Sequence, residues 1–304
     1  MTKTAEQEQE WLAHEVTRSG IEVRYGVKPK RVYQIRKGPK GRWKTIPSVT
    51  TVLDELKAEG LVWWGQRVGI EGVLTLFGKG LVRAAGHNGV SVLACADPSG
   101  ALVVAGVPQI EELLKREKLT VNSVRDAAGD RGQNVHDAFE TWSNDPSLLP
   151  DPSMFPPSEA GYVAGLRKFI EESKAIPLAA EVQVGSAKHG FAGRYDIRLQ
   201  LPEDVELVVH HTPVRGEKRE LFQAGIWLCD LKTSRRAYAK HALQLAAYEA
   251  ASIECGYEPT LGRCVIQVDS EGNYRFVRCN ATEKDFISVL RLWRTLQNSK
   301  EWLG

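Results

Sequence analysis

Two short stretches of the chain carry carboxylates in positions that suit metal-assisted hydrolysis. Asp196 ends the motif Gly193-Arg-Tyr-Asp196 inside one predicted strand, and Asp230 lies two residues before Lys232 in another, 226–232. Side chains alternate along a strand, so Asp230 and Lys232 are expected on one face. Two carboxylates on neighbouring strands form a hard oxygen site for Mg²⁺ or Mn²⁺, and a nearby lysine can orient water or stabilise charge on a phosphate. Taken alone, Asp-x-Lys also fits a surface salt bridge.

Two predicted helices carry polar residues at helical spacing. Upstream, Arg131-Gly-Gln-Asn-Val-His136 places a histidine one turn before Glu140. Downstream, Gln244 and Tyr248 are four residues apart and share one helix face. Each pattern by itself also fits a buried histidine with satisfied hydrogen bonds or a polar stripe on a helix.

A segment near the N-terminus concentrates positive charge. Nine basic residues and no acidic residue lie between Arg24 and Lys44, although the formal net charge of the whole chain is only +2. Tyr25, Tyr33 and Trp43 are interleaved with these cations. Cations attract phosphates and aromatic rings stack on bases, so the segment suits a nucleic-acid strand, with Lys44 among the expected contacts. A solvated, positively charged hairpin is the alternative interpretation.

The composition narrows the class of protein. With 42% hydrophobic and 26% charged residues, the chain is typical of a globular protein rather than a disordered or collagen-like one. Its longest apolar stretch, 101–107, is far shorter than the roughly 20 residues of a membrane span, so no membrane partner is expected. The acidic N-terminus does not fit a signal peptide. Five scattered cysteines without a CxxC indicate reduced thiols, and His210-His211 has no third nitrogen or sulfur ligand nearby for zinc.

The hydrophobic pattern predicts the elements that position these residues. Strands are expected at 21–25, 32–36, 42–46, 181–186, 191–201, 205–211, 220–223, 226–232, 264–268 and 274–279. Helices are expected at 48–56 with Ser48 as N-cap, 61–76, 108–118, 123–142 with a Ser123/Asp126 capping box, 160–173, 238–254 and 282–296. This order predicts an α/β or α+β core with a mixed sheet. We expect one domain, 1–304, in which an N-terminal β/helical elaboration, 1–120, precedes a core, 121–304, and in which 78–105 suggests an insertion.

Together, four of these elements resemble the RecB-type branch of the PD-(D/E)XK nucleases. They are a GxxxH-like helix, a GxxD strand, a DxK strand and a QxxxY helix, in this order over about 124–248. The resemblance implies a restriction-endonuclease-like core, in which helices flank a central mixed β-sheet. It also implies roles for individual residues: His136, Asp196, Asp230 and the Leu231 carbonyl as ligands of Mg²⁺ or Mn²⁺, in a pair of ions; Asp196, Asp230 and Lys232 as catalytic residues; Gln244, supported by Tyr248, as a contact to the lysine or the nucleic-acid backbone; and Glu181 as a supporting acid.

A second resemblance lies near the N-terminus. Residues 46–53, Ile-Pro-Ser-Val-Thr-Thr-Val-Leu, followed by Trp63-Trp64, look like the entry segment of phage RecB-like exonucleases and of the mitochondrial genome maintenance exonuclease. The resemblance implies a passage for single-stranded DNA. Ser48 and Thr50 would donate to phosphates, and Trp63 or Trp64 would stack on a base. A capped helix with buried tryptophans is the structural alternative.

This sequence also differs from the family pattern in three places. The interval between Asp196 and Asp230 is long for this branch, and 202–222 is expected to form an additional hairpin beside the site. The cysteines that hold an iron–sulfur cluster in some relatives are missing, so no cluster is expected. Residues 78–120 match nothing in the family.

The resemblance implies a divalent-metal-dependent DNA exonuclease that hydrolyses phosphodiester bonds by a two-metal mechanism in recombination, replication or repair. Its substrate would be DNA that is single-stranded or has a free end, and a recombination protein is an expected partner. Its expected location is the cytoplasm of a bacterium or a phage-infected host. A non-catalytic DNA-binding accessory protein is the alternative. A hydrolase of small phosphoesters is a third class, against which the long basic segment argues.

Overall fold

The structure is a computed structural model that describes residues 10–28, 32–54, 56, 61–87, 90–97, 100–212 and 216–299. It has a mixed α/β architecture with several sheets and helices. Contacts divide the chain into two units. The main unit is Met1–Leu56 with Asn134–Gly304, and the inserted unit is Lys57–Gln133. From the sequence, the N-terminal elaboration is expected to end at residue 120. The boundaries between the two units lie instead after residues 56 and 133.

The main unit is built on a five-stranded sheet with the strand order β14-β13-β12-β9-β8. Its strands are β8 (Ile176–Ser186), β9 (Phe191–Leu201), β12 (Gly225–Lys232), β13 (Gly262–Val268) and β14 (Tyr274–Arg278). β12 and β13 pair in parallel and the other neighbours pair antiparallel, so the sheet is mixed. The five strands predicted here are confirmed, and β8 begins five residues before the predicted 181–186.

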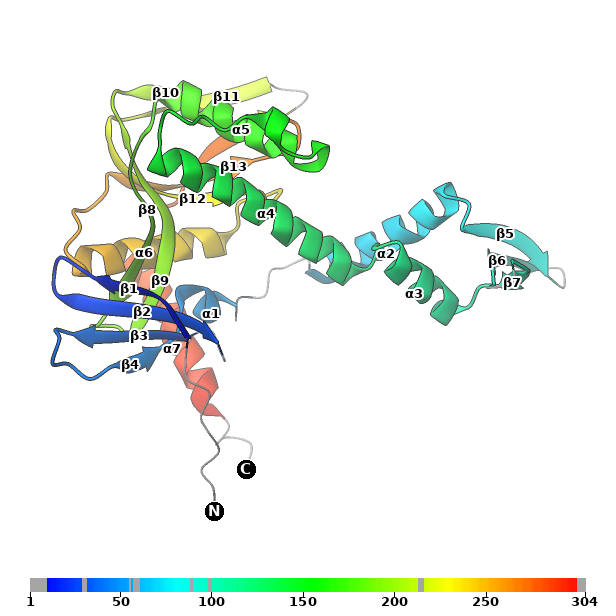
Figure 1. The fold of residues 1–304 in the computed structure, drawn as a ribbon, viewed down its shortest axis with the longest axis horizontal. Helices are drawn as coiled ribbons and strands as arrows, with labels where there is room; N and C mark the ends of the chain where they lie inside the picture. The colour runs from blue at the N-terminus through cyan, green and yellow to red at the C-terminus, as the bar shows by residue number, and fades with distance from the viewer. Residues whose placement is uncertain are drawn as a thin grey trace, which may run out of the picture. The chain divides into compact units, whose positions relative to one another are not determined.

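Helices cover both faces of this sheet (Figure 1). The helices around it are α1 (Val49–Leu53), α4 (Val121–Asn144), α5 (Pro157–Ser173), α6 (Ala239–Glu254) and α7 (Glu283–Asn298), with a 3₁₀ turn at Pro152–Met154. Trp227, Cys229 and Leu231 of β12 join one hydrophobic core with α4 and α5. Leu228 joins the other core, with α1, α6 and α7. Alternate side chains of β12 therefore pack into two different cores, as expected for a strand that is buried on both faces.

The start of α4 corrects one prediction. The helix begins at Val121, so the predicted N-cap at Ser123 with Asp126 is wrong. Instead, the Oγ1 of Thr120 accepts a hydrogen bond from the backbone N–H of Ser123 at 3.2 Å. The chain has already turned at Lys118, which has a φ of 56°, so the earlier of two suitable capping residues is the one in position.

A second, four-stranded sheet lies at the N-terminal end of the main unit. Its strands, in spatial order, are β1 (Glu10–Val16), β2 (Ile21–Lys28), β3 (Val32–Lys37) and β4 (Lys44–Ile46). Ile21, Val23 and Ile35 form a small core with Ala192 of β9, so this sheet is anchored on the central one. The sequence predicted β2, β3 and β4 and missed β1, whose acidic residues obscure the alternation of a strand.

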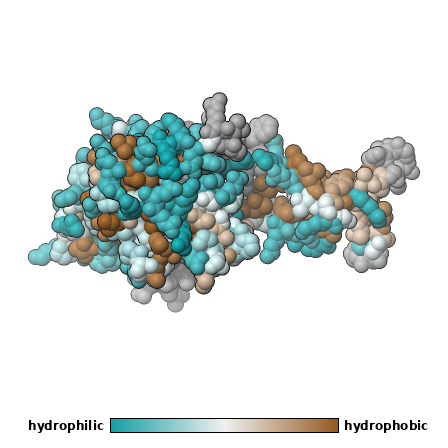
Figure 2. Space-filling view, turned by 90° about the horizontal axis from the view of Figure 1, so that it is seen from above, coloured by the Kyte–Doolittle hydropathy of each residue, from teal (hydrophilic) through white to brown (hydrophobic). Residues whose placement is uncertain are grey.

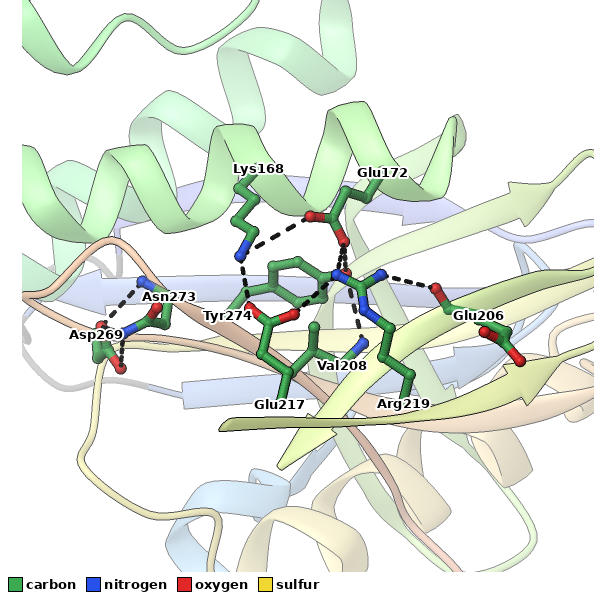
Figure 3. A network of polar contacts seen from close by, with 9 residues as sticks. All are labelled: Lys168, Glu172, Glu206, Val208, Glu217, Arg219, Asp269, Asn273 and Tyr274. Carbon is green, nitrogen blue, oxygen red and sulfur yellow. Dashed lines mark hydrogen bonds and ion pairs between the residues drawn. The ribbon is translucent and has the colours of Figure 1, made fainter. Parts of the chain in front are cut away.

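The predicted hairpin is formed by β10 (Val205–Thr212) and β11 (Gly216–Phe222), and it packs against α5 and β14. A polar network joins these elements (Figure 3). Lys168 of α5 lies 2.8 Å from Glu217, and Arg219 lies 2.9 Å from both Glu172 and Glu217. The hydroxyl of Tyr274 donates to Glu172 at 2.6 Å. The hairpin is thus tied to the α5 side of the sheet by alternating charges.

The inserted unit has its own small core. It contains α2 (Leu61–Gly78), β5 (Val82–His87), β6 (Val90–Ala96), β7 (Leu102–Val104), α3 (Val107–Arg116) and the start of α4. Leu76, Val82 and Leu113 are buried together. Figure 2 shows apolar surface on this unit, where Ile70 and Leu74 of α2 are each 62% exposed. Neither α2 nor any other helix in the described part of the chain is long and apolar enough to cross a membrane.

Candidate active site

Three neighbouring strands bring three carboxylates together. Between β8 and β9, the pairs Ala180–Ile197 and Val182–Tyr195 flank Glu181 and Asp196, which therefore lie opposite each other. Between β12 and β9, the last pair is Cys229–Ile197, so the next residues, Asp230 and Asp196, are neighbours on the other side of β9. Residues directly opposite each other on adjacent strands have Cβ atoms roughly 5 Å apart. The carboxylates therefore form a row across the sheet. The sequence contains each of the three residues, but the row arises from strand order and register.

A histidine from α4 completes a group of potential metal ligands. His136 Nδ1 lies 3.5 Å from Asp196 Oδ2. One ligand atom each of His136, Glu181 and Asp196 lies within 4.8 Å of the others, and all three residues are partly buried. Carboxylate oxygens with one imidazole suit Mg²⁺ or Mn²⁺, so the donor set fits the metals expected from the sequence.

The lysine predicted beside this site faces a buried carboxylate. Lys232 Nζ lies 2.6 Å from Asp230 Oδ2 and donates to the carbonyl of Leu231 at 3.2 Å. The side chain of Asp230 is only 1% exposed, and burial raises its pKa against the lowering effect of Lys232. Burial lowers the pKa of Lys232, but the carboxylates of Asp230 and Asp196 more than offset this effect. Two oxygens expected to bind metal thus face one ammonium group.

Asp196 is held in place by the neighbouring strand. Its Oδ2 accepts a hydrogen bond from the backbone N–H of Leu231 at 2.8 Å. The contact links the central carboxylate of the row to β12, next to the residue that carries the second carboxylate. The positions of Asp196 and Asp230 are therefore coupled through the backbone of one strand.

Glu181 has an unusual backbone for a strand residue. Its φ is 54°, in the left-handed region that side chains other than glycine rarely adopt. Its carboxylate lies 2.7 Å from Nε of Arg194, a residue that the sequence analysis did not single out although it lies in the GxxD motif. Burial and the neighbouring Asp196 raise the pKa of Glu181 to about 7, against the lowering effect of Arg194. Residues with such a backbone cluster at functional sites, and they also occur where the chain turns, as at Lys118.

The glutamine of α6, hydrogen-bonded to the tyrosine of the same helix, contacts one end of the row, at Asp230. The amide of Gln244 donates to Asp230 Oδ1 at 3.3 Å and to the hydroxyl of Tyr248 at 3.2 Å. The resemblance implies a contact of Gln244 with the lysine or with nucleic acid. In the structure, its amide contacts the buried carboxylate of Asp230, and the contact with nucleic acid stays a prediction.

His241 was missed by the sequence analysis. It lies three residues before Gln244, a spacing that puts both on the same face of α6, and this spacing was visible in the sequence. Its side chain is buried, and its Nδ1 accepts a hydrogen bond from the backbone N–H of Tyr238 at 3.3 Å. Burial and the neighbouring Lys232 lower its pKa to about 4, so the imidazole is neutral at physiological pH.

Gly193 has a packing role within the same group. A Cβ at Gly193 would lie 2.4 Å from Cε1 of Tyr248, so the ring of Tyr248 packs directly on the backbone of β9. Glycine is required there by the close approach of α6, rather than by its own backbone conformation. The GxxD and QxxxY motifs are therefore in direct contact.

Gly193→Ala is expected to lower the free energy of unfolding by about 1–3 kcal/mol, because the added methyl group would displace Tyr248. Gly129→Ala, in α4, is the matched control, since a Cβ there meets nothing within 4 Å. It should be neutral or raise stability by up to about 1 kcal/mol. Urea denaturation measures both variants, and equal effects would contradict the packing role of Gly193.

The entry segment packs on the core of the main unit. Ser48 is the N-cap of α1, as predicted, and its Oγ accepts from the backbone N–H of Thr51 at 3.0 Å. The helix ends at Leu53, three residues before the predicted end. Thr50 is exposed, and its hydroxyl lies 3.0 Å from that of Ser48. The backbone N–H of Ala192 donates to the Pro47 carbonyl, so this segment adjoins the start of β9.

The other residues predicted to bind nucleic acid lie apart from α1 in the chain. Lys44 is exposed on β4. Trp64 lies in α2 of the inserted unit with 36% of its surface exposed. Trp63 belongs to the same helix, and its side chain lies outside the described part of the chain.

Two arginines of the basic segment, 24–44, already contact aromatic rings of the same sheet region. The guanidinium of Arg24 lies over the rings of Trp11 and Trp43, 3.9 and 4.2 Å from their centroids, and that of Arg36 lies 4.5 Å from Trp43. Arg36 also pairs with the buried Glu22 at 2.6 Å. These cation–π contacts stabilise the β1–β4 sheet. Trp43 therefore has a structural role besides any contact with nucleic acid.

Two remaining features of the sequence lie elsewhere. His210 and His211 belong to β10, opposite Lys218 and Glu217 of β11. The five cysteines are buried and free. Among the described residues, the group of three potential metal ligands is the one formed by His136, Glu181 and Asp196.

A scan against protein-family models found no match for the chain. A search of curated protein sequences found none either. The interpretation of the site therefore depends on its own geometry and chemistry.

Proposed function

We propose that the main unit is a divalent-metal-dependent deoxyribonuclease with a PD-(D/E)XK-type core of the RecB branch. The observation that carries the proposal is the row of Glu181, Asp196 and Asp230 across three strands, with His136 and Lys232 beside it. A buried carboxylate such as Asp230, 1% exposed, and a left-handed backbone such as that of Glu181 both cost free energy, so they are not expected in an accidental surface cluster. Perturbed carboxylates grouped with a lysine are typical of catalytic sites.

Asp196, Asp230, His136 and the Leu231 carbonyl would hold the metal, and Glu181 would support it. The fit is supported by His136, Glu181 and Asp196, each of which offers one ligand atom within 4.8 Å of the others. When bound, Mg²⁺ or Mn²⁺ would neutralise charge on the phosphate oxygens and favour ionisation of the attacking water.

The residues of the chain have separate roles in this proposal. Lys232 stays protonated at neutral pH because the adjacent carboxylates raise its pKa, so it acts as a donor that orients water or stabilises phosphate charge. Gln244 and the backbone N–H of Leu231 hold Asp230 and Asp196 in place. The strained backbone at Glu181 and its contact with Arg194 hold the third carboxylate toward Asp196.

The substrate in this proposal is DNA, single-stranded or with a free end. The exposed cations of the N-terminal sheet support a polymeric anion over a small phosphoester. Exonuclease action in recombination, replication or repair, with a recombination protein as partner, follows from the resemblance of the entry segment. The same proposal places the protein in the cytoplasm of a bacterium or a phage-infected host, where DNA is present.

The test is incubation of the purified protein with 5′-labelled and 3′-labelled DNA, single- and double-stranded, in Mg²⁺, Mn²⁺ or EDTA. Cleavage in either metal and none in EDTA is the expected result, and the order of product lengths from each labelled end gives the polarity. Salt-sensitive binding without cleavage of any substrate would instead favour the non-catalytic accessory protein.

A further inference from the structure

The segment that joins β12 to α6, residues 233–238, is held in place by side-chain hydrogen bonds to its carbonyls. Gln267 of β13 donates to the carbonyl of Ser234 at 2.5 Å, and Arg275 of β14 donates to the carbonyl of Arg235 at 3.1 Å. The hydroxyl of Ser234 donates to the carbonyl of Arg236 at 2.9 Å. Three successive carbonyls therefore have side-chain donors, two of them from neighbouring strands. Such a segment presents its own side chains in a fixed place.

The segment and the adjoining start of α6 carry positive charge. Residues 231–248 contain four lysines and arginines and no acidic residue, although the whole chain has 40 basic and 38 acidic residues. Arg235 and Arg236 are exposed and Lys240 is half-buried. Within the part of the chain that the structure describes, no carboxylate forms an ion pair with these three side chains. Their charge is therefore available to a ligand.

An aromatic ring lies among these cations. Tyr238 is 42% exposed, and its ring packs edge-on against His241 with the centroids 5.6 Å apart. The backbone N–H of Tyr238 donates to Nδ1 of the same histidine. An exposed ring held in this way can stack on a base without losing much side-chain freedom.

The segment is also close to the proposed catalytic lysine. Arg235 follows Lys232 by three residues, which span at most about 11 Å even when fully extended. If the scissile phosphate of a DNA strand lies at Lys232, another phosphate of the same strand, a few nucleotides away, would lie beside Arg235.

We propose that Arg235, Arg236 and Lys240 bind the phosphodiester backbone of a single strand next to the scissile phosphate, with Tyr238 as a stacking platform. This inference rests on the proposed nuclease function and identifies the surface that holds the strand. Single-stranded nucleic acid is favoured because exposed cations interleaved with an aromatic ring match both its phosphates and its unpaired bases.

The test compares the wild type with Arg235→Gln/Arg236→Gln/Lys240→Gln. Binding of a fluorescent 20-nucleotide single-stranded DNA is measured in EDTA between 50 and 200 mM salt. Each phosphate contact on a single strand contributes roughly 0.7 to the slope of log K against log salt, so the slope should fall by about 2. The control is Arg167→Gln/Lys174→Gln/Lys218→Gln, which removes the same charge from α5, from its C-cap Lys174 and from β11, and should leave the slope unchanged.

A second measurement separates this proposal from the nuclease proposal. The ratio of kcat/KM for the 20-nucleotide strand to that for a dinucleotide should fall at least about tenfold in the Arg235 triple variant, because only the longer substrate reaches the segment. If neither protein cleaves either substrate, the nuclease proposal fails, and the salt dependence of binding still decides this one. A slope equal to that of the wild type, or an equal loss in both triple variants, would overturn the assignment of the segment.

Discussion

Lys232→Ala is expected to reduce kcat for DNA cleavage by at least about a hundred- to a thousandfold, while the affinity for DNA stays close to that of the wild type. Loss of a single donor to developing charge has effects of this size. The reason lies in the position of the ammonium, 2.6 Å from Asp230 Oδ2 and beside the Leu231 carbonyl. Single-turnover cleavage of labelled DNA in Mg²⁺, together with binding in EDTA, measures the two effects separately.

The same variant has an expected effect on stability. It leaves the Asp230 carboxylate, which is 1% exposed, without its ammonium partner, and breaking a buried ion pair in this way costs about 3–5 kcal/mol. A divalent cation bound by Asp230 would offset that loss. Addition of Mn²⁺ should therefore raise the thermal midpoint of Lys232→Ala by more than that of the wild type.

Lys218→Ala is the control for both measurements, because Lys218 is an exposed lysine of β11 that pairs with Glu220. It should retain the cleavage rate and the thermal midpoint of the wild type. Cleavage by Lys232→Ala within about tenfold of the wild-type rate would show that Lys232 has a structural rather than a catalytic role.

Asp196→Asn is expected to abolish metal-dependent cleavage and to weaken Mn²⁺ binding by at least about a hundredfold. Loss of residues that only support metal ligands already costs 10- to 100-fold, and Asp196 lies at the centre of the proposed ligand group. Asparagine keeps an oxygen that can accept the 2.8 Å hydrogen bond from Leu231, so the fold should be retained. Calorimetric titration with Mn²⁺ and the labelled-DNA assay measure the two losses.

The matched control is Asp204→Asn. Asp204 also accepts a backbone hydrogen bond, from Ala224 at 2.8 Å, but it lies outside the row of carboxylates. It should bind Mn²⁺ and cleave DNA as the wild type does. Unchanged Mn²⁺ affinity in Asp196→Asn would exclude Asp196 as a ligand and would leave the site without its central carboxylate.

The strands and helices that carry the motifs were predicted from local patterns. β9 has the predicted bounds, β12 begins one residue earlier than predicted, and α6 begins directly after the predicted Tyr238. These elements have strong apolar periods and are buried on well-defined faces, so local sequence and tertiary packing favour the same conformation. Prediction was poorer where competing signals lie close together, as at the start of α4, where Thr120 rather than Ser123 caps the helix.

The sequence by itself determined which groups are available for chemistry: Asp196 in a strand, Asp230 and Lys232 two apart, and His136 and Gln244 on helices. The resemblance already suggested Glu181 as a supporting acid. Only the tertiary structure decided its place opposite Asp196, that Arg194 faces it, and that Gln244 contacts Asp230. The physical reason is that side-chain period is a local property of the chain. Strand order, register and the left-handed backbone at Glu181 are set by contacts between segments far apart in the sequence.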